Sequence, residues 1–490
     1  MVVAAVLCQL LLASSAAGSD RELLGAVRAL LPRAEQAGAA AQGAAANANT
    51  VQRQYDTARD LQEALRAAEP VSRSCAPLLR AALNYARGEV LQAEGFDRPS
   101  VAIRAAGVKR AAAARAAVEK ARPRCRPAIA PASRPVPELV APRTGEAFYG
   151  DVEATVPAGA SGAILLLDGT ERERATVTST RISFRLTAPP GGYDLRVRFL
   201  AGGREVGTAQ SRGVWLLPAS AKRSTPERAT DRALAIKLEA LGQSFAGKAG
   251  LWVHDLASGL TAGWNADARF PAASTVKLGL LVAALQRFGP APEDSRVAYD
   301  LRALAGWSSN VATNRLLVAL GGSEAAGSRI AQATLRRLGA RSSTFTGSYQ
   351  PGTRIAFPFL DAPDPPPLVS PRVTTAHDLG RILAVLHAAA IGNGTALARS
   401  GLSIHEARVG LAMLLSSQAT GDNVGLFRPA LGPAFPMAQK HGWLSSVRHS
   451  AAILYGADGP TIVVLLTYRP ALTRAQATRL GTRLIRLVNP

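Results

Sequence analysis

Three short groups of residues in the second half of this 490-residue chain have the types and spacing needed to form and break an acyl bond. The first is Ser274-Thr275-Val276-Lys277, in which a lysine follows a serine by three positions. On a helix these two side chains share one face, so the ammonium group can reach the hydroxyl. A serine hydroxyl is a poor nucleophile near neutral pH and needs a base or a cation to lose its proton. The spacing predicts Ser274 as a nucleophile and Lys277 as its partner.

The second group is Ser308-Ser309-Asn310. The hydroxyl of Ser308 could relay a proton between Lys277 and a leaving group. The side-chain amide of Asn310 could hold an amide of the substrate. We therefore interpret this group as a proton relay beside a substrate contact.

The third group is Lys440-His441-Gly442-Trp443, at the end of a predicted strand. The lysine supplies a cation, and the glycine lets a substrate approach the backbone closely. Each of the three groups alone also occurs by chance. Their order, their spacing and the strand–helix framework around them favour a single active site.

This set of motifs resembles that of the class A beta-lactamases and related penicillin-binding enzymes, which carry Ser-x-x-Lys, Ser-Asp-Asn and Lys-Thr-Gly. The resemblance covers about residues 235–490. It implies that Ser274 is the acylated nucleophile and that Ser308 shuttles the proton. It also implies that Asn310 binds the acyl side-chain amide and that Lys440 attracts the substrate carboxylate.

The resemblance extends to groups around the motifs. It implies an oxyanion hole made by the backbone N–H groups of Ser274 and Trp443, each donor contributing roughly 3 kcal/mol. Arg448, early on the next predicted strand, resembles the family's second carboxylate-binding cation. Asn314 resembles a structural buttress, and residues 374–379 resemble the helix start that follows the family's active-site loop.

Three departures from the family pattern bear on the reaction. Ser309 stands where the family has Asp, and His441 stands where it has Thr or Ser, so an imidazole would have to replace a hydroxyl donor. Class A enzymes use a loop glutamate to activate the water that clears the acyl-enzyme, but no glutamate occurs between Glu324 and Glu406. Asp361 lies near the expected position, amid prolines. Acylation with slow deacylation is therefore expected.

These observations predict a serine hydrolase that forms an acyl-enzyme with a beta-lactam or with a D-alanyl-type peptide or ester of peptidoglycan. One alternative is a penicillin-binding carboxypeptidase or esterase, and another is a non-catalytic cell-envelope-binding protein. The six histidines form no His-Glu-x-x-His pair, and the chain has no Gly-x-Ser-x-Gly elbow and no phosphate-binding loop. We expect no metal and no cofactor.

The hydrolase motifs fall within residues 233–490, for which the resemblance implies an α/β domain: an antiparallel sheet flanked by helices, plus an all-α subdomain. Strands are expected at 251–255, 262–270, 437–441, 448–455 and 461–468, and a closing helix at 473–488. Residues 145–218 instead alternate apolar and polar residues with a period of two, as in Tyr193 to Phe199. They predict a small β-sandwich of the immunoglobulin or fibronectin type III kind, joined to the hydrolase by a linker at 219–232.

Residues 19–122 have apolar residues at helical spacing and predict a helical domain that Pro32 and other prolines divide. Residues 123–144 predict a Pro-rich linker. Cys75 and Cys125 would remain after a signal peptide is removed. They predict one disulfide, which would stabilise the fold by roughly 4 kcal/mol; two buried free thiols are the alternative.

The first 18 residues are apolar and end in a small-residue cleavage pattern, so they predict a signal peptide, with an uncleaved anchor as the alternative. We expect a secreted or envelope-associated protein without a further membrane span. The net charge of +22 arises from 57 basic and 35 acidic residues. It is consistent with an anionic cell-wall polymer as a partner or with a bias toward arginine in the composition. Arginines do not cluster with aromatic residues, which make up 5 % of the chain, so nucleic acid is not an expected partner.

Overall fold

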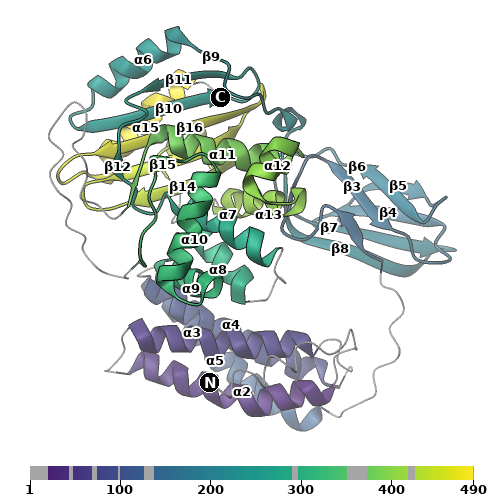
Figure 1. Ribbon diagram of the computed structural model, residues 1–490. Coiled ribbons are helices and arrows are strands. Elements are labelled where there is room, and N and C mark those ends of the chain that lie inside the picture. Colours follow the sequence, from purple (N-terminus) through teal and green to yellow (C-terminus); the bar gives the residue numbers. More distant parts are fainter. Residues whose placement is uncertain are drawn as a thin grey trace. The chain divides into compact units, whose positions relative to one another are not determined.

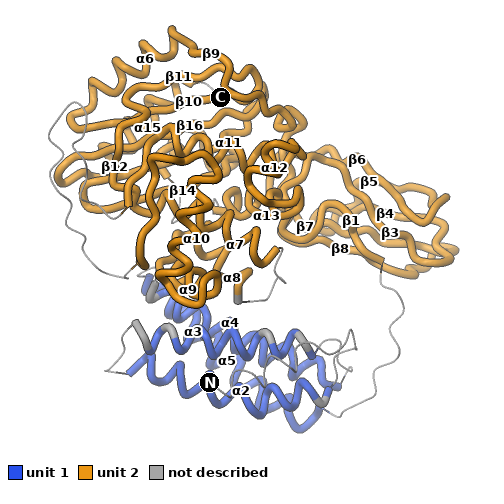
Figure 2. Tube along the Cα trace, viewed as in Figure 1, with its two compact units in different colours: residues 1–135, 294–296 blue, residues 136–293, 297–490 orange. Residues whose placement is uncertain are grey.

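The computed structural model describes residues 20–43, 48–68, 74–97, 100–125, 137–289, 296–349, 372–417 and 425–488. The expected signal peptide, half of the expected Pro-rich linker, and Asp361 lie outside these residues. The chain divides into two compact units, one of residues 1–135 with 294–296 and one of residues 136–293 with 297–490 (Figure 2). Each unit has a hydrophobic core of its own.

The first unit is helical, and its successive helices pack against one another (Figure 1). Its elements are α2 (Asp20–Gln42), α3 (Ala48–Ala67), α4 (Ala76–Asp97), α5 (Val101–Ala121) and the short 3₁₀ helix η1 (Arg122–Arg124). Pro32 does not divide the first helix as predicted, because it lies inside α2. Its neighbours Leu31 and Ala34 are buried in the core. Packing of this face therefore maintains the helix despite the backbone donor that proline lacks.

Helices α4 and α5 approach closely because small residues line their contact. A Cβ added at Gly88 would lie 2.6 Å from the backbone N of Ala111, and one added at Gly107 would lie 2.7 Å from the backbone N of Gln92. Larger side chains at either glycine would force the helices apart. Cys75, just before α4, and Cys125, just after η1, form a disulfide across this pair of helices.

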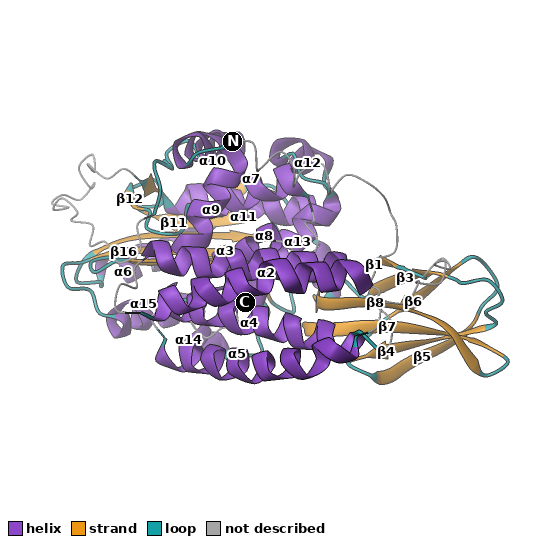
Figure 3. Cartoon of the chain, turned by 90° about the horizontal axis from the view of Figure 1, so that it is seen from below, coloured by secondary structure: helices purple, strands orange, loops and turns teal. Residues whose placement is uncertain are grey.

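Residues 139–216 of the second unit form two sheets around one apolar core (Figure 3). The three-stranded sheet has the order β1 (Leu139–Ala141), β3 (Asp151–Thr155), β6 (Arg181–Arg185). The five-stranded sheet has the order β2 (Ala147–Phe148), β8 (Arg204–Leu216), β7 (Gly191–Ala201), β4 (Gly162–Leu167), β5 (Thr170–Thr176). Gly191 and Gly192 begin β7, although paired glycines favour a turn. A Cβ on Gly192 would contact the Trp215 ring at 3.4 Å, so glycine serves packing there.

A six-stranded sheet forms the centre of the remaining domain. Its order is β14 (Met437–Trp443), β15 (Arg448–Tyr455), β16 (Pro460–Tyr468), β10 (Lys248–Asp255), β11 (Leu260–Trp264), β9 (Ala229–Thr230). All neighbouring pairs are antiparallel except β9 with β11. The strand expected at 262–270 is wrong in extent, because β11 ends at Trp264 and Phe270 belongs to a separate two-residue strand.

Helices cover both faces of this sheet, which explains why its central strands are buried along almost their whole length. Helices α6 (Arg232–Gln243), α14 (Arg428–Leu431) and α15 (Arg474–Val488) share a core with one face. On the other side, a larger core collects the remaining helices. They are α7 (Lys277–Phe288), α8 (Arg296–Gly306), α9 (Asn310–Gly321), α10 (Glu324–Arg337), α11 (Ala376–Ala390), α12 (Gly394–Ser400) and α13 (Ile404–Leu415). The sheet and its flanking helices match the expected α/β architecture.

The segment expected as a linker at 219–232 is structured. It contains η2 (Ala219–Lys222) and the edge strand β9, and Ala221 is fully buried. Ala147 and Tyr149, from the two-sheet part, enter the same hydrophobic core as α7 and α11. The two-sheet part therefore packs onto the helical side of the larger domain. In the described part of the chain, no helix has both the length and the apolarity to span a membrane.

Candidate active site

Ser274 lies in a tight turn between a short strand and a helix. Strand β12 (Phe270–Pro271) pairs with β13 (Val373–Thr374), and the turn then leads into α7. Ala273 has a φ of 49°, a left-handed conformation that is strained for a residue with a Cβ. The first turn of helix is wound tightly, since the N–H of Lys277 donates to the carbonyl of Ser274 at 3.3 Å. This turn leaves Ser274 half-buried and accessible from the surface.

A buried histidine anchors the strand that precedes this turn. The Nδ1 of His449 accepts a hydrogen bond from the N–H of Thr467 at 3.1 Å. Its Nε2 therefore carries the proton and donates to the carbonyl of Pro271 at 2.7 Å. Burial lowers the pKa of His449 to about 4, so the ring stays neutral at physiological pH. The ring thus links β15 to β12, three residues before Ser274.

Lys277 is fully buried and holds the second motif against the nucleophile helix. Its Nζ donates to the carbonyl of Ser308 at 2.7 Å, to the carbonyl of Ser309 at 3.2 Å and to the Oδ1 of Asn310 at 2.8 Å. The Asn310 amide is therefore oriented with its oxygen toward Lys277, which leaves its NH₂ group as the end that can meet a substrate carbonyl.

The backbone of the second motif is also strained at the residue expected to relay a proton. Ser308 has a φ of 65°, which turns the chain sharply between α8 and α9. Ser309, the residue that replaces the family's Asp, caps α9, because its Oγ accepts from the N–H of Ala312 at 3.0 Å. The substitution at Ser309 therefore retains a helix-capping acceptor.

Lys440 connects the third motif to the second. Its Nζ donates to the Oγ of Ser308 at 2.7 Å and to the carbonyl of His441 at 2.9 Å. The side chain has no exposed surface. Burial lowers the pKa of Lys440 to about 7, because the charged form is poorly solvated there. Lys277 and Lys440 thus both reach Ser308, one at its carbonyl and one at its hydroxyl.

Strand β14 lies at the open edge of the sheet (Figure 1). It also approaches the nucleophile turn closely at Gly442. A Cβ added at Gly442 would lie 3.0 Å from the backbone N of Ser274 and 3.0 Å from the carbonyl O of Ala272. Any side chain at this position would push the strand away from the turn. Glycine therefore lets strand β14 approach the backbone of Ser274 closely.

His441 is buried at this junction, and its ring lies 4.9 Å from that of Trp443, centre to centre. Burial, and then the neighbouring cations, hold the pKa of His441 well below its ordinary value. The imidazole is therefore neutral at physiological pH. One ring nitrogen can then donate to a substrate carboxylate while the ring adds no charge.

Two arginines extend the positive charge along the same rim. The guanidinium carbon of Arg448 lies 5.1 Å from the centre of the Trp443 ring, and that of Arg474 lies 5.3 Å from it. Arg448 was expected here from the sequence. Arg474 was not, because it begins a helix outside all three motifs.

Tyr349 and Arg372 also belong to the site but were not identified from the sequence. The Tyr349 hydroxyl donates to the carbonyl of the strained Ala273 at 3.0 Å. Its ring centre lies 4.3 Å from the Nζ of Lys277 and 3.9 Å from the guanidinium carbon of Arg372. Burial raises the pKa of Tyr349 to about 12, so its hydroxyl remains a donor. The side chain of Asn314 brackets the backbone of Tyr349, consistent with the expected buttress.

The structure thus brings the three motifs into one cluster. Ser274 and Gly442 are in backbone contact, Lys277 and Lys440 converge on Ser308, and Arg448 borders the rim. The site can lower the pKa of a hydroxyl, supply a proton through Ser308 and attract an anionic group. In the described ranges, no three His, Cys, Asp or Glu side chains gather as metal ligands would.

The chain is similar to proteins of known family. The model of the Beta-lactamase enzyme family matches residues 233–291 and 295–488. Among solved structures, PBP-A is 19 % identical over 54 % of this chain and 97 % of its own, with a TM-score of 0.42. The beta-lactamase from Desulfarculus baarsii is 20 % identical over 53 % of this chain and 98 % of its own, with a TM-score of 0.41. The class A beta-lactamase of the last common ancestor of Gram-negative bacteria is 24 % identical over 52 % and 98 %, with a TM-score of 0.41. Comparison with curated proteins gave no match.

Proposed function

The chain belongs to the beta-lactamase enzyme family, and from that premise we propose that it is a serine hydrolase in which Ser274 forms an acyl-enzyme with beta-lactams or D-alanyl-type substrates. The observation that carries this proposal is the convergence of Lys277 and Lys440 on Ser308, beside the turn that holds Ser274. A nucleophile with neighbouring groups that accept and return its proton is the arrangement that covalent catalysis requires.

In the proposed reaction, the Ser274 oxygen attacks the carbonyl carbon of the substrate while its proton passes to the Lys277–Ser308 network. The carbonyl oxygen becomes an oxyanion and is stabilised by the backbone N–H groups of Ser274 and Trp443. The C–N bond then breaks, and the nitrogen takes the proton of the Ser308 hydroxyl. Lys440, which donates to that hydroxyl, replaces this proton, and the proton taken from Ser274 then returns to Lys440 through the Lys277–Ser308 network. Water later hydrolyses the ester.

The cationic rim supports a substrate with a carboxylate near the bond that breaks. Lys440 and Arg448 supply charge, and the neutral His441 supplies an N–H donor where the family has a hydroxyl. Strand β14 is at the sheet edge, so its outer backbone groups can pair with an extended substrate. These features fit a peptide-like acyl chain that ends in a carboxylate.

We further propose that deacylation is slow. The resemblance assigns activation of the hydrolytic water to a loop glutamate, and residues 325–405 contain none. The proposal has three further parts. The protein is secreted or envelope-associated, the two-sheet part is related to immunoglobulin or fibronectin type III domains, and the chain contacts an anionic wall polymer. They fit the apolar N-terminus, the strand pattern and the net charge of +22.

The test is covalent labelling of the full chain with a fluorescent penicillin, followed by intact mass measurement. We expect one adduct per chain, on the peptide that contains Ser274. Ser274→Ala should reduce the labelling rate by about a thousandfold or more. Ser445→Ala, a change at an exposed serine two residues beyond β14, should label like the parent.

A chromogenic cephalosporin then separates the alternatives within the class. A stoichiometric burst without turnover agrees with slow deacylation, whereas steady turnover would identify an efficient beta-lactamase and refute that part of the proposal. No label above that of Ser274→Ala would refute acylation and favour a non-catalytic envelope-binding protein.

A further inference from the structure

A second cavity lies on the helical side of the domain, lined by none of the residues assigned to the acylation site. Its volume is about 610 Å³. Its walls come from the segment before α6, the end of β10, the loop after α10, and helices α11 and α12. No step of the proposed acyl transfer uses it.

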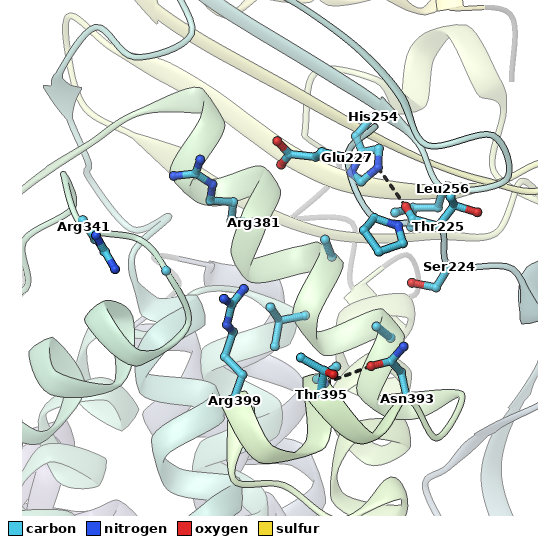
Figure 4. Close-up of a pocket in the computed structure, with 16 residues that line it drawn as sticks. Ser224, Thr225, Glu227, His254, Leu256, Arg341, Arg381, Asn393, Thr395 and Arg399 are labelled. Carbon is cyan, nitrogen blue, oxygen red and sulfur yellow. Dashed lines mark hydrogen bonds between the residues drawn. The ribbon is translucent and has the colours of Figure 1, made fainter. Parts of the chain in front are cut away.

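Three arginines from three different elements share one side of this cavity. They are Arg341 after α10, Arg381 on α11 and Arg399 on α12. Figure 4 shows Arg341 and Arg399 across the cavity from His254, with Glu227 between Arg381 and His254. A Cβ added at Gly339, on the same wall, would lie 3.9 Å from Cδ of Arg381 and 4.0 Å from Nη1 of Arg399. The side chains of Arg381 and Arg399 therefore reach the same point.

Within the ranges that the structure describes, none of these three guanidinium groups forms an ion pair. One acidic residue, Glu227, lines the cavity, but its carboxylate lies 3.3 Å from Nε2 of His377. His254 also lines the cavity. Burial is the main cause that lowers the pKa of His254, so its ring is neutral near pH 7. The hydrogen bond with His377 and, to a smaller extent, the charge of Arg381 lower the pKa of Glu227. One carboxylate therefore lies among three guanidinium groups, and the cavity keeps an excess of positive charge.

Polar contacts outside the cavity anchor the elements that carry these arginines. The Oδ2 of Asp378, on α11, accepts from the N–H of Ser342 at 2.8 Å and from the Oγ of Ser343 at 2.9 Å. These bonds hold the segment that carries Arg341 against the first turn of α11. The Nη2 of Arg337 donates to the carbonyl of Ser400 at 3.2 Å, which ties the end of α10 to the end of α12. The arginines thus project from a preorganised frame.

The rest of the lining is mainly apolar. Ala384, Val385 and Ala388 present one face of α11, and Leu256 lies at the end of β10. Planar guanidinium groups bind phosphate and carboxylate oxygens through paired hydrogen bonds. An apolar surface beside them suits the carbon skeleton of an organic anion.

We propose that this cavity, which we call the arginine cavity, binds a small multivalent oxyanion, a phosphate or a polycarboxylate. Its charged groups lie at Arg341, Arg381 and Arg399, and its carbon skeleton lies over Ala384, Val385 and Ala388. The site is independent of acylation at Ser274.

The chief competing explanation for any anion binding is general attraction to a protein of net charge +22. Such attraction is weakened by salt and does not depend on any single arginine. The same substitution at an arginine outside the cavity therefore distinguishes specific binding in the cavity from general attraction. Arg479 is exposed on α15 and does not line the cavity, so Arg479→Gln removes the same charge from a different surface.

The test is isothermal titration of the full chain at about 150 mM NaCl, where exposed charges more than about 8 Å apart are largely screened, with pyrophosphate and citrate as separate probes. We expect saturable binding of at least one probe at one site per chain; the probe that binds identifies phosphate or carboxylate as the preferred group. Arg399→Gln and Arg341→Gln should each weaken binding by about tenfold. Arg479→Gln should change it by less than about twofold.

Arg341 and Arg399 are exposed, so these variants should fold, and penicillin labelling of Ser274 reports on the fold in each. Absence of saturable binding by both probes would overturn the proposal. An equal loss in Arg479→Gln, or undiminished binding in both cavity variants, would also overturn it.

Discussion

Lys440 illustrates how burial changes what a side chain can do. Removal from water lowers its pKa to about 7, so its charge depends on pH in the range where the enzyme is expected to act. In the charged form it donates to the Ser308 hydroxyl and can attract a carboxylate. His441, beside it, is held neutral by the same burial and the same cations. Histidine at this position therefore supplies an N–H donor in place of the hydroxyl, and it does so without a positive charge that would repel Lys440.

The pH dependence of acylation tests this assignment of Lys440. With its pKa at about 7, Lys440 is protonated below that pH and neutral above it. The second-order rate constant for acylation by a penicillin should therefore fall as the pH rises past 7, approaching about tenfold per pH unit. Stopped-flow measurement of adduct formation gives this constant for the free enzyme.

Lys440→Arg is the matched variant, because arginine remains charged throughout this range. The acylation rate constant of Lys440→Arg should be lower than that of the parent. It should not decrease as the pH rises past 7. A parent rate constant that rises through pH 7 would contradict the role of donor and cation, and would identify neutral Lys440 as a base.

Secondary-structure elements position these residues, and two of the elements meet through backbone atoms. The edge strand β14 and the turn before α7 touch through backbone atoms at Gly442, which has no side chain to separate them. In the first unit, a covalent bond holds two elements together. The disulfide between Cys75 and Cys125 joins the start of α4 to the end of η1, and small residues between α4 and α5 bury little area. The cross-link therefore supplements a weak apolar interface.

Removal of this disulfide should destabilise the helical unit. The two cysteines are 50 residues apart, so Cys75→Ser with Cys125→Ser should lower the free energy of unfolding by about 4 kcal/mol. Urea unfolding followed by far-ultraviolet circular dichroism measures the loss. A reducing agent should produce a similar loss in the parent and none in the variant.

The rate of penicillin labelling serves as the control, because Ser274 belongs to the other unit and the double variant should keep it. Unchanged urea unfolding after loss of both thiols would show that the helix contacts alone set the stability of the unit.

The chain divides into two compact units, and the two-sheet part shares the second unit with the hydrolase. The first unit has its own apolar cluster of buried Leu, Ala, Val and Tyr side chains. The two-sheet part has a core as well, but Ala147, Tyr149, Leu217 and Ala221 also enter the core of the hydrolase. The ring of His405 on α13 forms a hydrogen bond with the buried Glu146 carboxylate across the same contact. The two-sheet part should therefore unfold with the hydrolase.

Calorimetry of the full chain should show two transitions, one for each unit. Tyr149→Ala removes a ring that is 4 % exposed from the shared core and should destabilise the second unit by roughly 3 kcal/mol. Loss of penicillin labelling should shift to lower temperature together with that transition.

Val206 belongs to the two-sheet part and is 45 % exposed. Val206→Ala should leave both the unfolding transition of the second unit and the penicillin labelling unchanged. If Tyr149→Ala produced a third, separate transition without affecting labelling, the two-sheet part would be an independent domain.

Local information in the sequence was sufficient for the order of the parts, the period of the strands, and the residue types of the three motifs. Strand β15 spans 448–455 as predicted, because its apolar residues 451–455 end at a glycine-containing turn. Ser274, Lys277, Ser308 and Lys440 were identified because each motif combines a reactive group with its partner at short range. Pairing of the two cysteines was also expected, since the predicted mature chain offers one combination.

Tertiary structure alone decided the features that depend on distance through space. Tyr349, Arg372 and Arg474 join the site from segments outside the motifs, and the arginine cavity gathers residues from five segments of the chain. Pro32 stays within a helix, and Gly192 lies in a strand, because neighbours distant in sequence outweigh local preference. The lowered pKa of Lys440 has the same origin. Solvation and packing are set by everything that surrounds a side chain, whereas periodicity and motifs report only on its neighbours along the chain.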